Sequence, residues 1–283
     1  MAKLRQLLPL ISQRTFSFIQ AQLKVVLNQN RKVWNTHTGE CLHTFQQPHI
    51  VRAVAFPHQP RPLVLAIGGF EKRLMLYELE KSSSDKGEGS LDQLGLSGLQ
   101  NGSQGYAGHE IGVGAHQGAI KSVLWTKESN VLITGCEDKH IRWFDIRSRD
   151  PVAEVKLDGI IGSCELSNTL STLSVAAGDK AYFFSGSTPG QLLHSIKQPT
   201  EIVSVALHEG QRKYVTGGNR DTWIRVWDLD AEEGAKELDV WKGHHGPTWN
   251  LSFSPDGKVC ASGSEDGTVK LWKFCEGPYG LWK

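Results

Sequence analysis

Hydrophobic and polar residues alternate along most of the chain, in short runs separated by turn-forming residues. Three consecutive runs are Ala119 to Trp125 (AIKSVLW), Val131 to Thr134 (VLIT) and Ile141 to Ile146 (IRWFDI). A period of two predicts β-strands that pack along one face. The less regular runs Val152 to Leu157 and Glu237 to Trp241 are expected to be fourth strands. The pattern therefore predicts repeated sheets of four short strands.

The strand pattern recurs along the chain. Six strands end in an aromatic anchor, namely Trp34, Tyr77, Phe144, Phe184, Trp227 and Trp272. The intervals between these anchors are 43, 67, 40, 43 and 45 residues. A period of about 40 to 45 residues is typical of repeat proteins in which each unit is one small sheet. The long second interval contains the Gly/Ser-rich stretch 82–108, which we interpret as a loop inserted between two units.

Histidines and acidic residues carry a second periodic signal. Three pairs are each 22 residues apart, namely His49 and Glu71, His116 and Asp138, and His244 and Asp266. In each pair the acid lies six residues before the aromatic anchor, and Asp221 has the same offset from Trp227. The acid is expected in a tight turn, where a carboxylate accepts hydrogen bonds from backbone N–H groups and from a nearby imidazole.

The unit nearest the C-terminus has the fullest polar set, which is His244, Ser262, Asp266 and Trp272, and Thr134 belongs to the network of an earlier unit. Serine, histidine and aspartate can form a catalytic triad, but recurrence in several units does not suit a single active site. We therefore interpret the set as a structural network. The motifs H-E-x-x-H, G-x-S-x-G and G-x-x-x-x-G-K-[ST] are absent from the sequence. We expect no enzyme activity, no catalytic or metal-binding residues and no cofactor.

Composition narrows the class of protein. The 283 residues carry a formal net charge of +1, so no global field favours nucleic acid or an anionic membrane. The five cysteines are widely spaced and lack a C-x-x-C pair, which disfavours a disulfide framework and a zinc site. No run approaches the roughly 20 apolar residues of a membrane span. We expect a water-soluble protein of a reducing compartment, with no membrane partner and no small-molecule substrate.

The segment GHHGPTWNLSFSPDGKVCASGSEDGTVKLWKF, residues 243–274, resembles a WD repeat. The resemblance extends over residues 32–283 and implies an all-β WD-repeat β-propeller, for which the family expectation is seven blades. Six units are recognisable, and the first is partial because it lacks its opening strands. The ring is therefore expected to be capped, expanded or unstable, since closure removes the unpaired edges of the sheets.

Residues 1–31 do not resemble a blade. The first acidic residue of the chain is Glu40, whereas basic and apolar residues are frequent before it. This composition is typical of a mitochondrial transit peptide, although a misassigned gene start or exon produces the same pattern. We interpret the N-terminus as truncated or atypical.

The ending EGPYGLWK, residues 276–283, together with GHHGP, resembles one group of WD-repeat scaffolds. Members of this group associate with the survival-of-motor-neuron complex, which loads Sm proteins onto spliceosomal RNA, and with receptor-kinase signalling proteins. The resemblance implies a non-catalytic scaffold of the cytoplasm and nucleus with a role in mRNA splicing, in which RNA is contacted through partner proteins. The repeats also resemble the WD-repeat i subunit of translation initiation factor three, which is an alternative.

Two surfaces are candidates for partner binding. The segment DKHIRWFDIR, Asp138 to Arg147, resembles a box with which some WD-repeat proteins bind cullin-type ubiquitin ligases. Arg147 is the one residue of this match that the ordinary pattern of the repeat does not explain. The tail residues Tyr279, Leu281 and Trp282 either anchor a partner or form the outer strand of the last blade.

Overall fold

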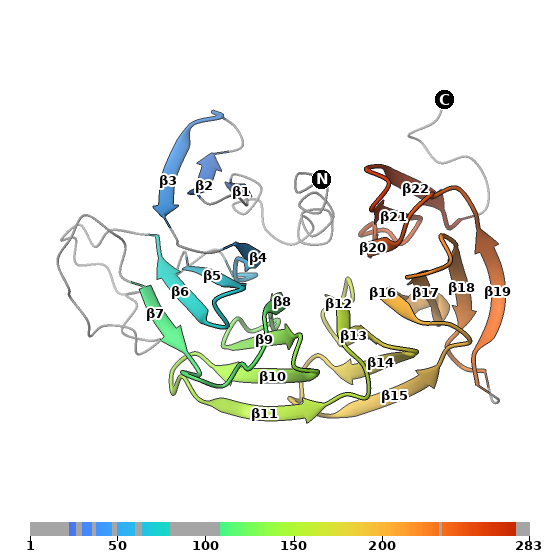
Figure 1. Ribbon diagram of the computed structural model, residues 1–283, viewed down its shortest axis with the longest axis horizontal. Helices are drawn as coiled ribbons and strands as arrows, with labels where there is room; N and C mark the ends of the chain where they lie inside the picture. The colour runs from blue at the N-terminus through green and yellow to red at the C-terminus, as the bar shows by residue number, and fades with distance from the viewer. Residues whose placement is uncertain are drawn as a thin grey trace. The chain divides into compact units, whose positions relative to one another are not determined.

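The computed structural model describes residues 23–26, 30–35, 38–46, 50–59, 64–79, 108–231 and 234–275. Within these ranges the chain forms six antiparallel sheets, of which four have four strands and two have three (Figure 1). The predicted fold class, an all-β protein of repeated small sheets, is confirmed. The chain divides into two compact units, one with strands β1 to β11 and one with β12 to β22.

The unit nearer the N-terminus contains three sheets. The first sheet has β1 (Leu23–Val26), β2 (Asn30–Asn35) and β3 (Cys41–Gln46). The second sheet has β4 (Val51–Ala55), β5 (Val64–Gly69), β6 (Leu74–Glu78) and β7 (Gly108–Ile111). The third sheet has β8 (Ile120–Trp125), β9 (Val131–Cys136), β10 (His140–Asp145) and β11 (Pro151–Lys156).

The other unit also contains three sheets. The fourth sheet has β12 (Ile161–Leu166), β13 (Thr172–Ala177), β14 (Lys180–Ser185) and β15 (Leu192–Lys197). The fifth sheet has β16 (Ile202–His208), β17 (Lys213–Gly218), β18 (Ile224–Asp228) and β19 (Lys236–Trp241), with the 3-10 turn η5 (Glu209–Gln211) after β16. The sixth sheet has β20 (Thr248–Phe253), β21 (Val259–Ser264) and β22 (Val269–Lys273).

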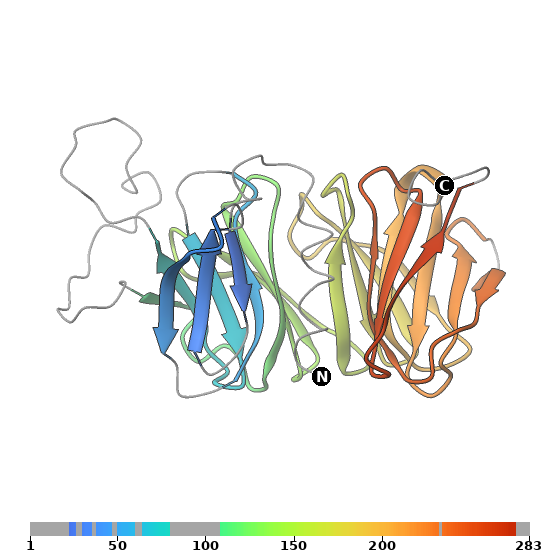
Figure 2. The same cartoon turned by 90° about the horizontal axis from the view of Figure 1, so that it is seen from above.

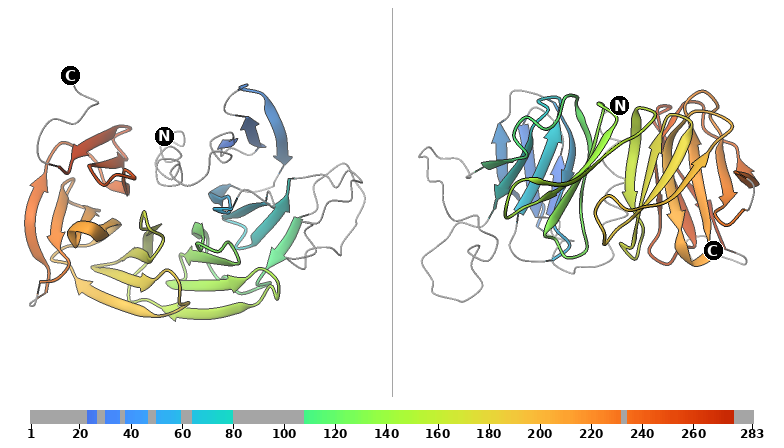
Figure 3. Two further views of the ribbon diagram at one scale, coloured as in Figure 1. Left: turned by 180° about the vertical axis from the view of Figure 1, so that it is seen from behind. Right: turned by 90° about the horizontal axis from the view of Figure 1, so that it is seen from below.

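The fourth strand is the most exposed strand in three of the four-stranded sheets. Every residue of β13 is buried, whereas β11, β15 and β19 are mostly exposed. Inner strands are covered on both faces because adjacent sheets of one unit pack on each other, as β4 does on β8 and β16 on both β12 and β20. Figure 2 shows the first and second sheets in blue and cyan, and Figure 3 shows the fifth and sixth in orange and red. The apolar alternation of the inner strands therefore fills the space between sheets.

The aromatic anchors mark a repeated irregularity in strand pairing. The third strand shifts register against the fourth immediately before the anchor in three sheets, at Phe144, Phe184 and Trp227. The pairing of β2 with β3 shifts in the same way at Trp34. A β-bulge at this position increases the local twist, which suits strands that must fan apart toward the surface.

The ends of the strand series differ from the middle. β1 begins at Leu23, before the predicted start of the repeats at residue 32, and pairs with β2. Because Trp34 lies on β2, the described part of the first sheet has one strand before its anchor strand where the other sheets have two. Most of the inserted stretch 82–108 lies outside the described residues. Within the described part of the chain, no helix is long and apolar enough to cross a membrane.

Candidate functional site

The sixth sheet contains the fullest polar network. Trp272 on β22 donates its indole Nε1–H to Ser262 Oγ on β21 at 2.7 Å. Ser262 Oγ lies 2.6 Å from His244 Nε2, and His244 Nδ1 lies 3.0 Å from Asp266 Oδ2. An indole N–H can only donate, so the serine hydroxyl is free to donate to His244 Nε2 while His244 Nδ1–H donates to the carboxylate. The chain of hydrogen bonds thus suits a neutral imidazole.

Asp266 fixes the turn between β21 and β22. Its carboxylate accepts the backbone N–H groups of His245 at 2.9 Å and Thr268 at 2.8 Å, and the Thr268 hydroxyl at 2.7 Å. Burial alone would raise the pKa of Asp266, but these hydrogen bonds and the one from His244 hold it well below its ordinary value. Ser262 is fully buried. A nucleophilic serine must reach its substrate, and Ser262 is too buried to do so. The set therefore orders the turn.

The third sheet has a variant of the network. His116 Nε2 lies 2.9 Å from Thr134 Oγ1, and the imidazole packs on Phe144 with ring centroids 5.3 Å apart. No hydrogen bond joins His116 to Asp138, and His116 Nδ1 has no partner among the described residues. Burial, with a smaller effect from Arg142, lowers the pKa of His116 to about 4. The imidazole is therefore neutral and packs as an aromatic ring.

Asp138 makes other contacts in place of the imidazole. It accepts the backbone N–H groups of Gln117 and His140, each at 3.0 Å, and pairs with Arg142 at 2.8 Å. Against the opposing effect of burial, these hydrogen bonds lower the pKa of Asp138. The acid thus orders the turn between β9 and β10, as Asp266 orders the later one.

The fifth sheet keeps only half of the network. Trp227 Nε1 donates to Thr216 Oγ1 at 2.8 Å, and Asp221 pairs with Arg225 at 2.7 Å. Pro199 lies 22 residues before Asp221, so the imidazole is missing. The sequence interpretation missed Thr216 because it lies eleven residues before its anchor, whereas Ser262 lies ten before Trp272.

In the fourth sheet the network is lost. Ser174 lies ten residues before Phe184 and is 1% exposed, but its hydroxyl has no hydrogen-bond partner among the described residues. Gly178 and Lys156 stand where the acid and the histidine would be. A phenyl ring has no N–H to donate, so the buried hydroxyl has lost the partner that it has in the sixth sheet.

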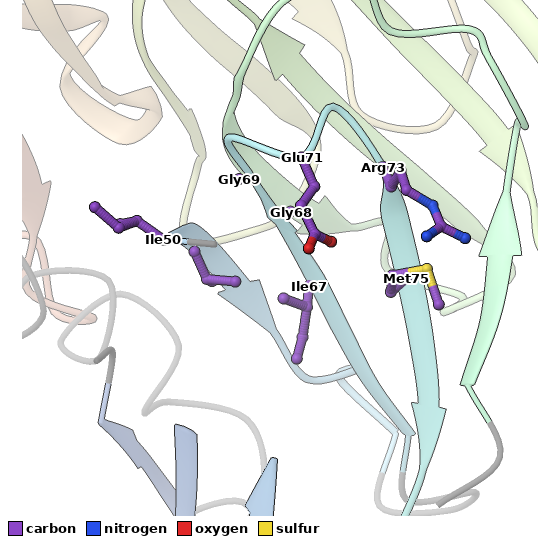
Figure 4. A pocket seen from close by; sticks show the side chains of 8 residues that line it. Ile50, Ile67, Gly68, Gly69, Glu71, Arg73 and Met75 are labelled. Carbon is purple, nitrogen blue, oxygen red and sulfur yellow. The ribbon is translucent and has the colours of Figure 1, made fainter. Parts of the chain in front are cut away.

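The second sheet replaces the serine with Ile67, and Glu71 lies in the turn between β5 and β6. Figure 4 shows a small hollow beside this turn, with the Glu71 side chain directed toward Ile67 and Arg73 directed away. The hollow has a volume of about 10 Å³, which is the space of one water molecule. Arg73 pairs with Glu110 on β7 at 2.6 Å. His49 lies outside the described residues.

An arginine recurs four residues after the turn acid in two sheets, buried at Arg142 and half-buried at Arg225, and the sequence interpretation did not assign it this role. Arg142 joins Asp138 at 2.8 Å to Glu154 on β11 at 2.9 Å. Arg225 in the fifth sheet likewise pairs with both Asp221 and Glu237. The spacing of four residues and a glutamate on the fourth strand would have been the signal. Each arginine ties the turn to the outer strand of its sheet.

The candidate partner-binding residues lie outside these networks. Arg147 is exposed in the turn after β10, where its backbone N–H donates to Asp145 Oδ1 at 2.7 Å. Tyr279, Leu281 and Trp282 lie outside the described residues. Among the described residues, no cluster of three or more histidine, cysteine or acidic side chains is arranged to hold a metal ion.

Comparison with known proteins places these repeats in a family. The WD domain, G-beta repeat signature matches residues 108–145 and 235–273. The serine-threonine kinase receptor-associated protein of Dictyostelium discoideum is 30% identical over 86% of this chain and 72% of its own length. The Bos taurus protein of that name is 30% identical over 89% of this chain. The chain spans 63% of the length of the Bos taurus protein.

Two further matches are more distant. Subunit I of eukaryotic translation initiation factor 3 from Scheffersomyces stipitis is 24% identical over 86% of this chain and 72% of its own length. A chain in a crystal structure of the mitotic checkpoint complex superposes with a TM-score of 0.69 at 14% identity, covering 90% of this chain and 74% of that chain. The structural likeness supports the propeller fold.

Proposed function

Because the chain belongs to the serine-threonine kinase receptor-associated protein family of WD-repeat proteins, we propose that it is a non-catalytic scaffold that holds protein complexes together. The observation that carries this proposal is that the polar residues of the sixth sheet bond to one another. His244, Ser262 and Asp266 order one turn through these hydrogen bonds, and the serine is buried. WD-repeat scaffolds present the loops between such strands to other proteins.

The proposed partners are components of the survival-of-motor-neuron complex, and the proposed process is the assembly of spliceosomal ribonucleoproteins. The tail EGPYGLWK and the family membership support this choice. Receptor kinases are a second proposed partner class, because the relatives' name associates them with such receptors. RNA would be contacted through the bound proteins, and the chain would act in cytoplasm and nucleus.

A translation role is the second candidate, favoured by the 24% identity to initiation factor 3 subunit I. The lower identity makes it the weaker candidate. One experiment separates the two functions. The tagged chain is purified from its native cells in moderate salt, and the retained proteins and RNA are identified.

Recovery of Sm proteins and survival-of-motor-neuron components is the expected result. Recovery of initiation-factor subunits without them would assign the chain to translation, and recovery of a cullin ligase would favour the ubiquitin alternative. Retention of no stable partner would contradict the scaffold proposal itself.

A further inference from the structure

Trp223 is an exposed tryptophan where the other repeats have a polar residue. It lies four residues before the anchor Trp227, and the matching residues of the second, third, fourth and sixth sheets are Arg73, His140, Lys180 and Thr268. Each of these four makes a local polar contact, for example His140 Nδ1 with the Asp138 carbonyl at 2.8 Å and Lys180 with Asp158 at 2.5 Å. Trp223 is 38% exposed. The repeat therefore does not need an indole at this position.

Cations surround the indole. Lys242, in the connection between β19 and β20, places Nζ 4.0 Å from the centroid of the Trp223 ring, and the Arg225 guanidinium carbon lies 5.4 Å from it. Arg225 is neutralised by Asp221 and Glu237. Lys242 is exposed and forms no ion pair with the part of the chain that the structure describes. A cation–π contact of this kind holds the ammonium group over the ring while leaving its charge available.

Two more cations lie on neighbouring parts of the chain. Arg220 is exposed in the same connection as Trp223 and has no ion pair within the described ranges. Lys270 on β22 packs beside the backbone after Lys242, since a Cβ built on Gly243 would lie 3.5 Å from Lys270 Nζ. The Trp223 patch, defined as Trp223 and Lys242, thus combines one apolar anchor with one positive charge.

We propose that the Trp223 patch binds an acidic segment of a partner protein, with a carboxylate on Lys242 and an apolar side chain against the exposed part of the indole. This inference rests on the proposed scaffold function and names one surface through which it acts. Tryptophan and cationic side chains are frequent among residues that dominate protein interfaces. The positive charge supplies the electrostatic complementarity for an acidic partner.

Single-stranded RNA fits the patch less well. Sequence-tolerant RNA binding relies on open aromatic faces for stacked bases and on a track of cations for the phosphates. Here Lys242 already lies over the indole at 4.0 Å. Asp221 and Glu237 stand beside Arg225 and would repel a polyanionic backbone. A short acidic segment places fewer charges against these carboxylates.

The test measures binding of three fluorescein-labelled probes to the purified full chain by anisotropy. The probes are a short peptide with acidic residues around one leucine, the same peptide with lysines in place of the acids, and an oligouridine RNA of equal length. The expected result is preferential binding of the acidic peptide. Trp223→Ala and Lys242→Glu should each weaken it at least about tenfold, which corresponds to about 1.4 kcal/mol.

Matched controls separate binding from folding. Leu238→Ala removes a similarly exposed apolar side chain, 42% exposed on β19 of the same unit, and should leave peptide binding unchanged. Trp223→Phe and Lys242→Arg should retain most of the binding. Thermal melts should show that every variant is folded at the temperature of the binding measurement.

Preferential binding of the RNA or of the lysine peptide, or no binding of the acidic peptide, overturns the inference. Equal affinities of Trp223→Ala, Lys242→Glu and the unsubstituted chain for the acidic peptide overturn it as well. These outcomes leave the scaffold function standing if the tagged chain still retains partner proteins from cells. Conversely, a chain that retains no partners contradicts the scaffold function, whatever the peptide does.

Discussion

Trp272 and Ser262 are joined by a 2.7 Å hydrogen bond that makes the serine hydroxyl the centre of the polar network in the sixth sheet. The same hydroxyl lies 2.6 Å from His244 Nε2. Removing it would leave both a half-buried indole N–H and a buried imidazole nitrogen without this partner. The hydroxyl therefore matters more here than at the equivalent positions of the other sheets, where fewer groups depend on it.

Ser262→Ala should destabilise the protein by about 1 to 3 kcal/mol, the cost of leaving buried polar groups unsatisfied. Ser174→Ala is the matched control, because Ser174 holds the same repeat position and is buried without a hydrogen-bond partner in the described structure. Its substitution should change the free energy of unfolding by much less. Urea titrations of both variants make the comparison. Equal losses would contradict the role of the network.

The two arginine bridges should also differ in strength. Arg142→Met leaves Asp138 and Glu154 without their cation, and the Arg142 side chain is only 5% exposed. Breaking a buried ion pair by removing one partner costs about 3 to 5 kcal/mol. Arg225→Met should cost less, since that side chain is 20% exposed and Asp221 is 25% exposed, whereas Asp138 is only 9% exposed. Thermal melts that ranked the two variants in the opposite order would contradict this account.

His116 should make stability depend on pH in a defined window. Its pKa is about 4 in the folded chain and 6.5 in the unfolded chain, so between these values the unfolded state binds more protons. Stability should therefore fall as the pH falls from 6.5 toward 4, by at most about 3 kcal/mol from this residue. Burial also lowers the pKa values of His58, His109 and His244, which adds to the effect.

His116→Gln isolates the contribution of that residue. The free energy of unfolding of this variant, measured by urea titration at several pH values, should fall less steeply over the window than that of the unsubstituted chain. The amide can still bond the Thr134 hydroxyl, so the variant should fold. A slope equal to that of the unsubstituted chain would show that His116 titrates alike in both states.

Arg147→Ala tests the ubiquitin-ligase alternative. Arg147 is exposed, and only its backbone N–H contributes a hydrogen bond to the turn after β10. The substitution should therefore change the free energy of unfolding by less than about 0.5 kcal/mol. On the scaffold account it should also leave the retained partners unchanged. Specific loss of a cullin adaptor from the Arg147→Ala purification would favour the alternative.

Much of the fold is predictable because each repeat has recognisable short-range sequence patterns. The aromatic anchors at intervals near 43 residues and the apolar alternation between turns identify the sheets, and the fourth strands at β11 and β19 follow the predicted runs. The bulges at the anchors are not predictable in this way. They arise from the packing of strands that diverge, and no single residue type marks them.

The polar network is predictable in its most complete copy and less so elsewhere. The sequence brings His244, Ser262 and Asp266 together through fixed spacing, but it does not reveal that Arg142 takes the place of the imidazole on Asp138. The contact of Trp223 with Lys242 is also hidden, because the two residues lie on different connections and no period relates them. Such pairs depend on the fold of the intervening strands.

The central claim, that the chain is a scaffold for ribonucleoprotein assembly, is tested most directly with purified components. The full chain is mixed with purified survival-of-motor-neuron complex and analysed by size-exclusion chromatography, with the initiation-factor 3 core in a parallel run. The account predicts that the chain co-elutes with the survival-of-motor-neuron complex and separately from the initiation factor. Separate elution from the survival-of-motor-neuron complex would contradict it, and co-elution with the initiation factor alone would assign the chain to translation.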